Sequence, residues 1–137
     1  MIAYLHRPRY SSSTEHGSQE DVQPIWNVLE QAGADLILGA HDHTYERFAP
    51  LSPAGVAVAE GSGIRSFVVG TGGAGLYEIG TPLPGSESRM ERHGILRLRL
   101  FADRYEWAFL TTDGTTADTG HSVTRRRTSS ATATTSP

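Results

Sequence analysis

The feature that most constrains the fold is a short apolar run that leads directly into a pair of histidines. The run is Leu-Ile-Leu at residues 36–38, and a Gly-Ala step separates it from His41 and His43. An apolar run of this length is typical of a strand buried on both faces of a sheet. Side chains two positions apart in an extended chain point the same way, so we expect the two histidines on one side and Asp42 on the other.

A second apolar segment near the amino terminus ends in the same way. Residues 2–5 lead into His6 and a proline, which breaks regular structure, and His16 follows beyond a polar stretch. Residues 19–32 place apolar side chains near the helical period after an acidic start, and Gly33 is a natural stop. Strand, helix and strand predict a βαβ unit, whose parallel strands bring both histidine-bearing ends to one edge of the sheet.

The second half of the chain is typical of antiparallel strands joined by loops. We expect a strand at residues 65–70, an exposed polar loop at 81–92, a hairpin at 95–110 and a short strand at 117–123. Residues 45–47 lead into a predicted loop with Pro50 and Pro53, and Arg47 is interpreted as a structural anchor rather than a phosphate ligand. From residue 125 a Thr/Ser/Ala-rich sequence predicts a disordered tail, so the folded domain is placed at residues 1–124.

Three glycines after the strand at 65–70 spell G-x-G-x-x-G, at Gly70, Gly72 and Gly75. Dinucleotide binding requires a helix directly after this motif, but two prolines and two glycines at 76–85 cannot open one. We therefore expect a tight turn at the histidine-bearing edge and not a nucleotide site.

Composition narrows the possible partners. A net charge of −3 indicates no basic face for nucleic acid. No apolar run approaches the ~20 residues of a membrane span, so no membrane partner is expected. The chain has no cysteine, which excludes disulfides and thiolate metal sites.

These motifs together resemble the later half of the calcineurin-like metallophosphoesterases, in particular the purple acid phosphatase type and its bacterial relatives. The resemblance rests on H-R-P-R-Y-S-S at residues 6–12 with His16, on G-A-D-L-I-L at 33–38 leading into H-D-H-T-Y-E-R at 41–47, and on F-V-V-G-T-G-G-A-G-L-Y at 67–77. It implies the α/β fold class, as the carboxyl-terminal part of a layered α/β/β/α sandwich. It also implies hydrolysis of phosphate monoesters at two metal ions, with Fe, Zn or Mn as the candidates.

The resemblance also implies roles for single residues. His6 and His41 match ligands of the second metal ion, and His43 matches a ligand of the first. His16 matches a histidine that faces the substrate phosphate, where it stabilises charge or protonates the leaving group. The family usually has glycine directly before the first motif histidine, where this chain has Ala40. His93 and His121 match no ligand position.

The family's first-half motifs, which supply carboxylate and asparagine ligands, do not occur in this sequence. Neutral imidazoles cannot hold two cations together without anionic ligands, so we expect a segment that lacks the amino-terminal half of its domain and is inactive alone. If His6, His41 and His43 converge, they could still bind a single zinc ion, with a water as the fourth ligand. The tail is of a kind that often links domains in secreted proteins, which favours an extracytoplasmic parent. The alternative is a non-catalytic β-rich binding or structural module that holds at most one metal ion weakly.

Overall fold

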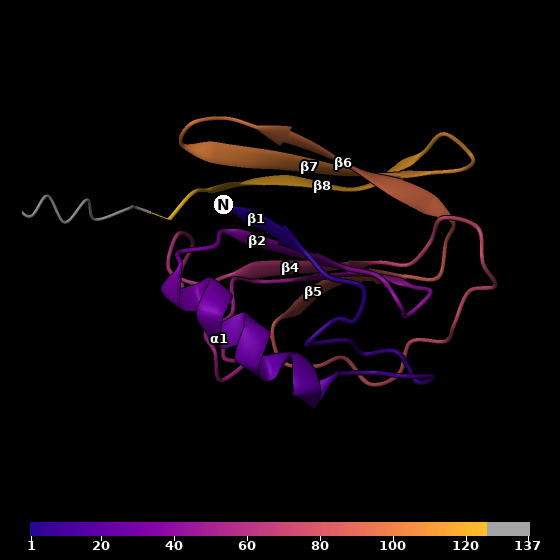
Figure 1. Cartoon of the computed structure of the whole chain (residues 1–137). Coiled ribbons are helices and arrows are strands. Elements are labelled where there is room, and N and C mark those ends of the chain that lie inside the picture. Colours follow the sequence, from indigo (N-terminus) through magenta and orange to yellow (C-terminus); the bar gives the residue numbers. More distant parts are fainter. Residues whose placement is uncertain (126–137) are drawn as a thin grey trace, which may run out of the picture.

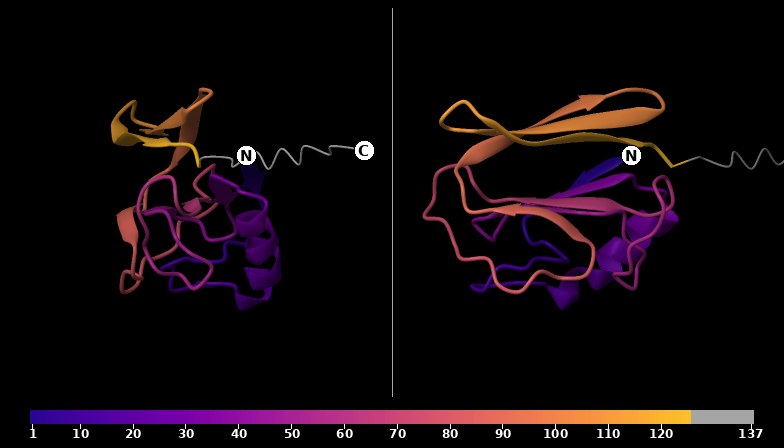
Figure 2. Two further views of the ribbon diagram at one scale, coloured as in Figure 1. Left: turned by 90° about the vertical axis from the view of Figure 1, so that its left-hand side faces the viewer. Right: turned by 180° about the vertical axis from the view of Figure 1, so that it is seen from behind.

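The computed structural model describes residues 1–125 and arranges them in three layers (Figures 1 and 2). In chain order the elements are β1 (Ile2–Tyr4), a 3-10 turn (Glu20–Val22), α1 (Gln23–Gln31), β2 (Leu36–Gly39), β3 (Tyr45–Phe48), β4 (Arg65–Val69), β5 (Ser86–Met90), β6 (Gly94–Leu100), β7 (Arg104–Thr111) and β8 (Thr116–Val123). The middle layer is a five-stranded sheet in the order β1-β2-β4-β3-β5. Helix α1 covers one face of it, and the three-stranded sheet β6-β7-β8 covers the other. The α/β class is confirmed.

The βαβ unit predicted at the amino terminus is present. Strands β1 and β2 pair in parallel, and α1 connects them. Pro24 lies in the first turn of α1, where its missing N–H would have no helical partner in any case. The helix ends before Gly33, whose φ of 71° is the left-handed conformation that glycine adopts without strain.

Strand β2 is buried from both sides, as its apolar sequence predicts. Leu36 packs into the core between the two sheets, and Ile37 packs into the core between the sheet and α1. The buried aromatic residues of the inter-sheet core are Tyr45, Phe67, Tyr105, Trp107 and Phe109. The core under α1 contains Trp26, Ala34, Phe48, Leu51 and Ile64.

Two strands were not predicted from the sequence: β3, in residues that lead into a predicted loop, and β5, in a region predicted to be an exposed loop, a prediction that is wrong. Strand β3 pairs antiparallel with both β4 and β5, so it belongs to the interior of the sheet. Its charged residues gave no strand pattern in the sequence. In the structure Glu46 is buried and accepts hydrogen bonds, and Arg47 is half-buried and forms ion pairs. Strand β5 is a sheet edge with the polar sequence Ser-Glu-Ser-Arg-Met, which carries no apolar alternation.

Two arginines tie the sheets together across the inter-sheet core. Arg47 pairs with Asp118 and Glu87, which confirms its role as a structural anchor. Arg65, only 2% exposed, pairs with Glu87 and also with Glu60. Each guanidinium carbon lies 4.9 Å from the ring centroid of Trp107, within cation–π range.

The carboxyl-terminal sheet matches its prediction. Strands β6 and β7 form the hairpin, and β8 adds antiparallel to β7. Arg125 still belongs to the folded part, because its backbone N–H donates to Asp35 at 2.6 Å and its guanidinium pairs with Glu30. The tail was predicted at residues 125–137, and apart from Arg125 it lies outside the described residues. Within the described part, no helix is long and apolar enough to span a membrane.

Candidate functional site

The candidate site lies at the carboxyl ends of the parallel strands. Strands β1, β2 and β4 run in the same direction side by side, so the segments that follow them meet at one edge. His6 follows β1, the turn at residues 40–43 follows β2, and the glycine-rich loop at 70–79 follows β4. Strand-end positions therefore bring His6, His41 and His43 to one edge, and His16 reaches it from the loop after β1.

The turn that carries His41 is not extended, which corrects the simple alternation expected for this stretch. His41 has a φ of 59°, and it is the one non-glycine residue of the described chain with a positive φ. The backbone N–H of Asp42 donates to the carbonyl of Ala40 at 2.6 Å, which closes the turn. The left-handed position is therefore His41 itself and not Ala40. Asp42 is fully buried.

Glycine at position 70 allows this turn to sit against β4. A Cβ atom built on Gly70 would lie 2.0 Å from the carbonyl oxygen of Asp42 and 3.0 Å from the Cα of His43. No side chain fits at such distances, so the turn can take this position only over a glycine. Gly70 was identified in the sequence as part of a tight turn, and its contact with the histidine turn gives it a specific role.

Three of the four candidate histidines pack directly on one another. The Nε2 of His6 and the Nδ1 of His41 are 3.1 Å apart. The ring of His16 stacks on that of His41, with centroids 4.2 Å apart and planes inclined by 25°. Zn–N bonds of about 2.0–2.1 Å at angles near tetrahedral or octahedral place two donor nitrogens roughly 2.9–3.4 Å apart. The His6–His41 separation therefore fits two ligands of one metal ion.

His43 belongs to the same cluster but points to different partners. Its Nδ1 lies 2.7 Å from the carbonyl oxygen of Gly75, and its ring stacks on Tyr77 with centroids 4.2 Å apart. Tyr77 in turn meets the ring of His16 edge-on at 5.6 Å. Across residues 1–125, no group of three or more His, Cys, Asp or Glu side chains is arranged to hold a metal ion. A single zinc site made of His6, His41 and His43 is therefore not formed.

The charge state of His41 suits metal binding. Partial burial, followed by the charges of His16 and His6, lowers the pKa of His41 below the usual histidine value. His41 is accordingly neutral at neutral pH, which is the form of imidazole that binds metal ions. The described residues thus fit the histidine part of a metal centre, and they do not supply the anionic part that a dinuclear centre needs.

The sequence did not predict the contacts that hold the loop of His16. Ser12 donates from its backbone N–H and its hydroxyl to the buried carboxylate of Glu46, at 2.7 and 2.6 Å. Ser86 donates to the same carboxylate. The sequence gave no indication that Glu46 accepts these hydrogen bonds, because Ser12 and Ser86 lie 34 and 40 residues away from it. The roles of Gly75 and Tyr77 beside His43 were missed for the same reason.

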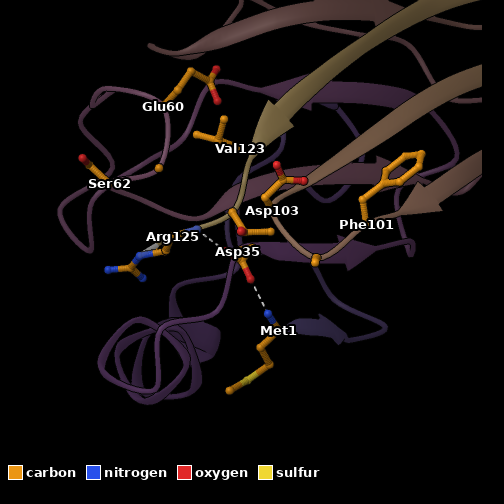
Figure 3. A pocket seen from close by; sticks show the side chains of 11 residues that line it. Met1, Asp35, Glu60, Ser62, Phe101, Asp103, Val123 and Arg125 are labelled. Atoms are coloured by element: carbon orange, nitrogen blue, oxygen red, sulfur yellow. Dashed lines mark hydrogen bonds and ion pairs between the residues drawn. The ribbon is translucent and has the colours of Figure 1, made fainter. Parts of the chain in front are cut away.

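A large cavity lies at the opposite edge of the sheet, away from the histidines. It has a volume of about 1040 Å³ and opens where β1, β2 and β4 begin (Figure 3). Its buried carboxylate, Asp35, already accepts hydrogen bonds from the amino terminus of Met1 and from the backbone of Arg125. These contacts are structural, and none of the candidate histidines lines this cavity.

Comparison with known proteins identifies the fold. No family model matches the chain, and no curated protein matches it either. Among solved structures, the purple acid phosphatase PPD1 from yellow lupin (Lupinus luteus) seeds is similar with a TM-score of 0.73 and 26% identity over 88% of this chain. The chain carries part of the purple acid phosphatase fold. It spans 24% of the lupin chain, so the activity of the whole enzyme does not pass to it directly.

The purple acid phosphatase fold is shared by a protein with a different description. GAP50, described as the anchor in the inner membrane complex of Plasmodium, is similar with a TM-score of 0.73 and 18% identity. That match covers 90% of this chain and 36% of the GAP50 chain. The same fold therefore occurs in an anchoring protein, and function must be argued from the site.

Proposed function

We propose that this chain supplies the histidine part of the metal centre in a phosphoesterase that hydrolyses phosphate monoesters. The observation that carries the proposal is the 3.1 Å separation of His6 Nε2 and His41 Nδ1 at the carboxyl edge of the parallel sheet. The exposed ring of His16 lies directly against this pair. The likeness to a purple acid phosphatase supports the reaction class.

The anionic ligands come from polypeptide outside these residues, placed beside β1. The outer edge of β1 has no strand partner within residues 1–125, and Tyr4 on this strand is 84% exposed. A groove of about 340 Å³ crosses the carboxyl ends of β1, β2 and β4 and reaches the start of β6, with a lining that is mostly apolar: Tyr4, Leu5, Leu38, Val69, Ile95 and Leu96. A further strand added at the outer edge of β1 would deliver its own carboxyl end next to His6.

The roles of the residues follow from their positions. His6 and His41 hold an ion, and His43 keeps its Nε2 atom available because its Nδ1 is engaged by Gly75. When bound, two such ions would supply Lewis-acid stabilisation of phosphate charge and an activated nucleophile. His16, exposed beside the pair, binds the phosphate and gives a proton to the leaving oxygen. The identity of the metals as Fe, Zn or Mn and an extracytoplasmic location stay predictions.

A zinc titration of the 137-residue chain tests the metal part of this proposal. Zinc should perturb the imidazole NMR signals of His6 and His41 together, because their Nε2 and Nδ1 atoms lie 3.1 Å apart. His41→Ala should weaken zinc binding at least about tenfold, since metal affinity already falls that far when an outer-shell partner is lost. His93→Ala is the matched control outside the cluster. Equal zinc affinity in both variants would remove the pair from the site.

Hydrolysis of an aryl phosphate with zinc, manganese or iron tests the catalytic part. The chain alone should show no turnover above the His41→Ala control, because it lacks anionic ligands. A longer polypeptide that adds a carboxylate-bearing strand beside β1 should be active, and His41→Ala should abolish that activity. If the longer polypeptide keeps its activity in the variant, His41 has no catalytic role.

A second candidate function is a non-catalytic binding or anchoring module. Two observations favour it: the likeness to GAP50, and the lack of any three-ligand set among residues 1–125. This alternative predicts that zinc does not distinguish His41→Ala from His93→Ala, and that extension of the chain restores no hydrolysis. The two experiments above therefore separate the two functions.

A further inference from the structure

We propose that the glycine-rich loop after β4, at residues 70–79, is a clamp that fixes the tautomer and the orientation of His43. Three contacts from this loop converge on that one residue. The carbonyl oxygen of Gly75 lies 2.7 Å from Nδ1 of the imidazole, and the ring of Tyr77 stacks on the imidazole at an angle of 20°. The backbone N–H of Tyr77 donates to the carbonyl of His43 at 3.1 Å.

The contact with Gly75 determines which ring nitrogen carries the proton. A carbonyl oxygen can only accept a hydrogen bond, so a neutral His43 must hold its proton on Nδ1. The Nε2 atom is then left with a free lone pair. A backbone carbonyl that takes one N–H of a histidine is a common way to orient the other nitrogen toward a ligand.

The ring of Tyr77 keeps this hydrogen bond from being lost to water. Gly75 is exposed, so water can compete with the imidazole for its carbonyl oxygen. An imidazole that was free to rotate would exchange the carbonyl for water. Stacking on Tyr77 restricts that rotation, and the edge of the same ring faces His16 at 5.6 Å. Tyr77 is thus a positioning residue that borders two of the four candidate histidines.

The value of the clamp to a metal centre rests on the proposed function, but the clamp itself is measured without metal or substrate. NMR of the whole chain labelled with ¹⁵N-histidine distinguishes the two neutral tautomers, and His43→Ala assigns the signal. We expect His43 in the Nδ1–H form. Tyr77→Leu should raise the ratio of the Nε2–H form to the Nδ1–H form roughly 2- to 12-fold, the range expected for loss of one stacked aromatic pair.

Two controls separate the clamp from a general loosening of the loop. Tyr77→Phe keeps the stacking ring and should keep the tautomer of the wild-type chain. His93 contacts the carbonyl of Thr71 in the same loop through its own Nδ1, at 3.2 Å, and stacks on no aromatic ring of the described chain. Its signal should stay unchanged in Tyr77→Leu.

Three results would overturn the proposal. An Nε2–H tautomer for His43 in the wild-type chain would show that Gly75 does not hold the ring. An unchanged tautomer ratio in Tyr77→Leu would remove the role of the stacking ring. Equal changes at His43 and His93 would indicate loss of loop structure instead of loss of a clamp. Failure of the zinc titration leaves these outcomes unaffected, so the two proposals fail separately.

Discussion

Replacing Gly70 with alanine should displace the histidine turn. The added Cβ would lie 2.0 Å from the carbonyl oxygen of Asp42, whereas close carbon–oxygen contacts in proteins are about 3.3 Å or longer. One backbone segment must therefore move by about 1.3 Å. The turn is the segment that can yield, because Gly70 continues from a buried strand of the central sheet.

The displacement has consequences for both stability and metal binding. Overpacking of this kind typically costs about 1–3 kcal/mol, which corresponds to a fall in Tm of roughly 3–15 °C for a domain of this size. His41 moves with the turn, so its Nδ1 no longer lies 3.1 Å from Nε2 of His6. Zinc affinity should then fall at least about tenfold, because the two donor nitrogens no longer keep a separation that suits one ion.

Thermal unfolding and zinc titration of Gly70→Ala measure these two effects. Gly72→Ala is a matched control, because it makes the same change two positions later where no atom lies within 4 Å of the new Cβ. The control should retain both its Tm and its zinc affinity. If Gly70→Ala behaves like Gly72→Ala in both assays, the turn does not depend on close approach at Gly70.

Two further predictions concern the buried carboxylates. Glu46→Gln should lower the free energy of unfolding by about 1.5–3 kcal/mol in urea titrations, because the carboxylate accepts charged hydrogen bonds from Ser12. Glu15→Gln, at an exposed position, is the control. Equal urea midpoints for the two variants would contradict the prediction. Burial acts to raise the pKa of Asp118, but hydrogen bonds from Arg47 and Tyr45 outweigh it and lower that pKa. The stability that Asp118 contributes is therefore complete above the ordinary aspartate pKa of about 3.9 and is lost as the pH falls through the lower folded value. Asp118→Asn should melt below the wild type at pH 7 and approach it well below pH 3.9, and a gap that stays constant with pH would refute the assignment.

The elements that the sequence predicted are those whose pattern is local. The βαβ unit follows from two apolar runs around an amphipathic helix, and the hairpin follows from alternation around a turn. Strand β3 was missed because its charged residues are buried by partners far along the chain, such as Asp118 for Arg47. Sequence alone gives no sign of such pairing, so buried charge is mistaken for solvent exposure.

The candidate site likewise has a part that the sequence predicted and a part that it did not. Strand ends placed His6 and His41 at one edge, and the structure brings them together with His16. The left-handed backbone at His41 could not be predicted, since it depends on the missing side chain of Gly70 nearly thirty residues later. The partners of His43 lie at a comparable distance, in a loop whose glycines suggested only a turn.

The positions of the two tryptophans make the layers of this fold separately observable by fluorescence. Trp26 lies in the core beneath α1. Trp107 lies between the sheets, with the guanidinium groups of Arg47 and Arg65 against its ring. The chain contains no other tryptophan, so Trp26→Phe and Trp107→Phe each leave one emitter. Comparison of their unfolding curves would show whether the outer sheet separates from the βαβ layer before the latter melts.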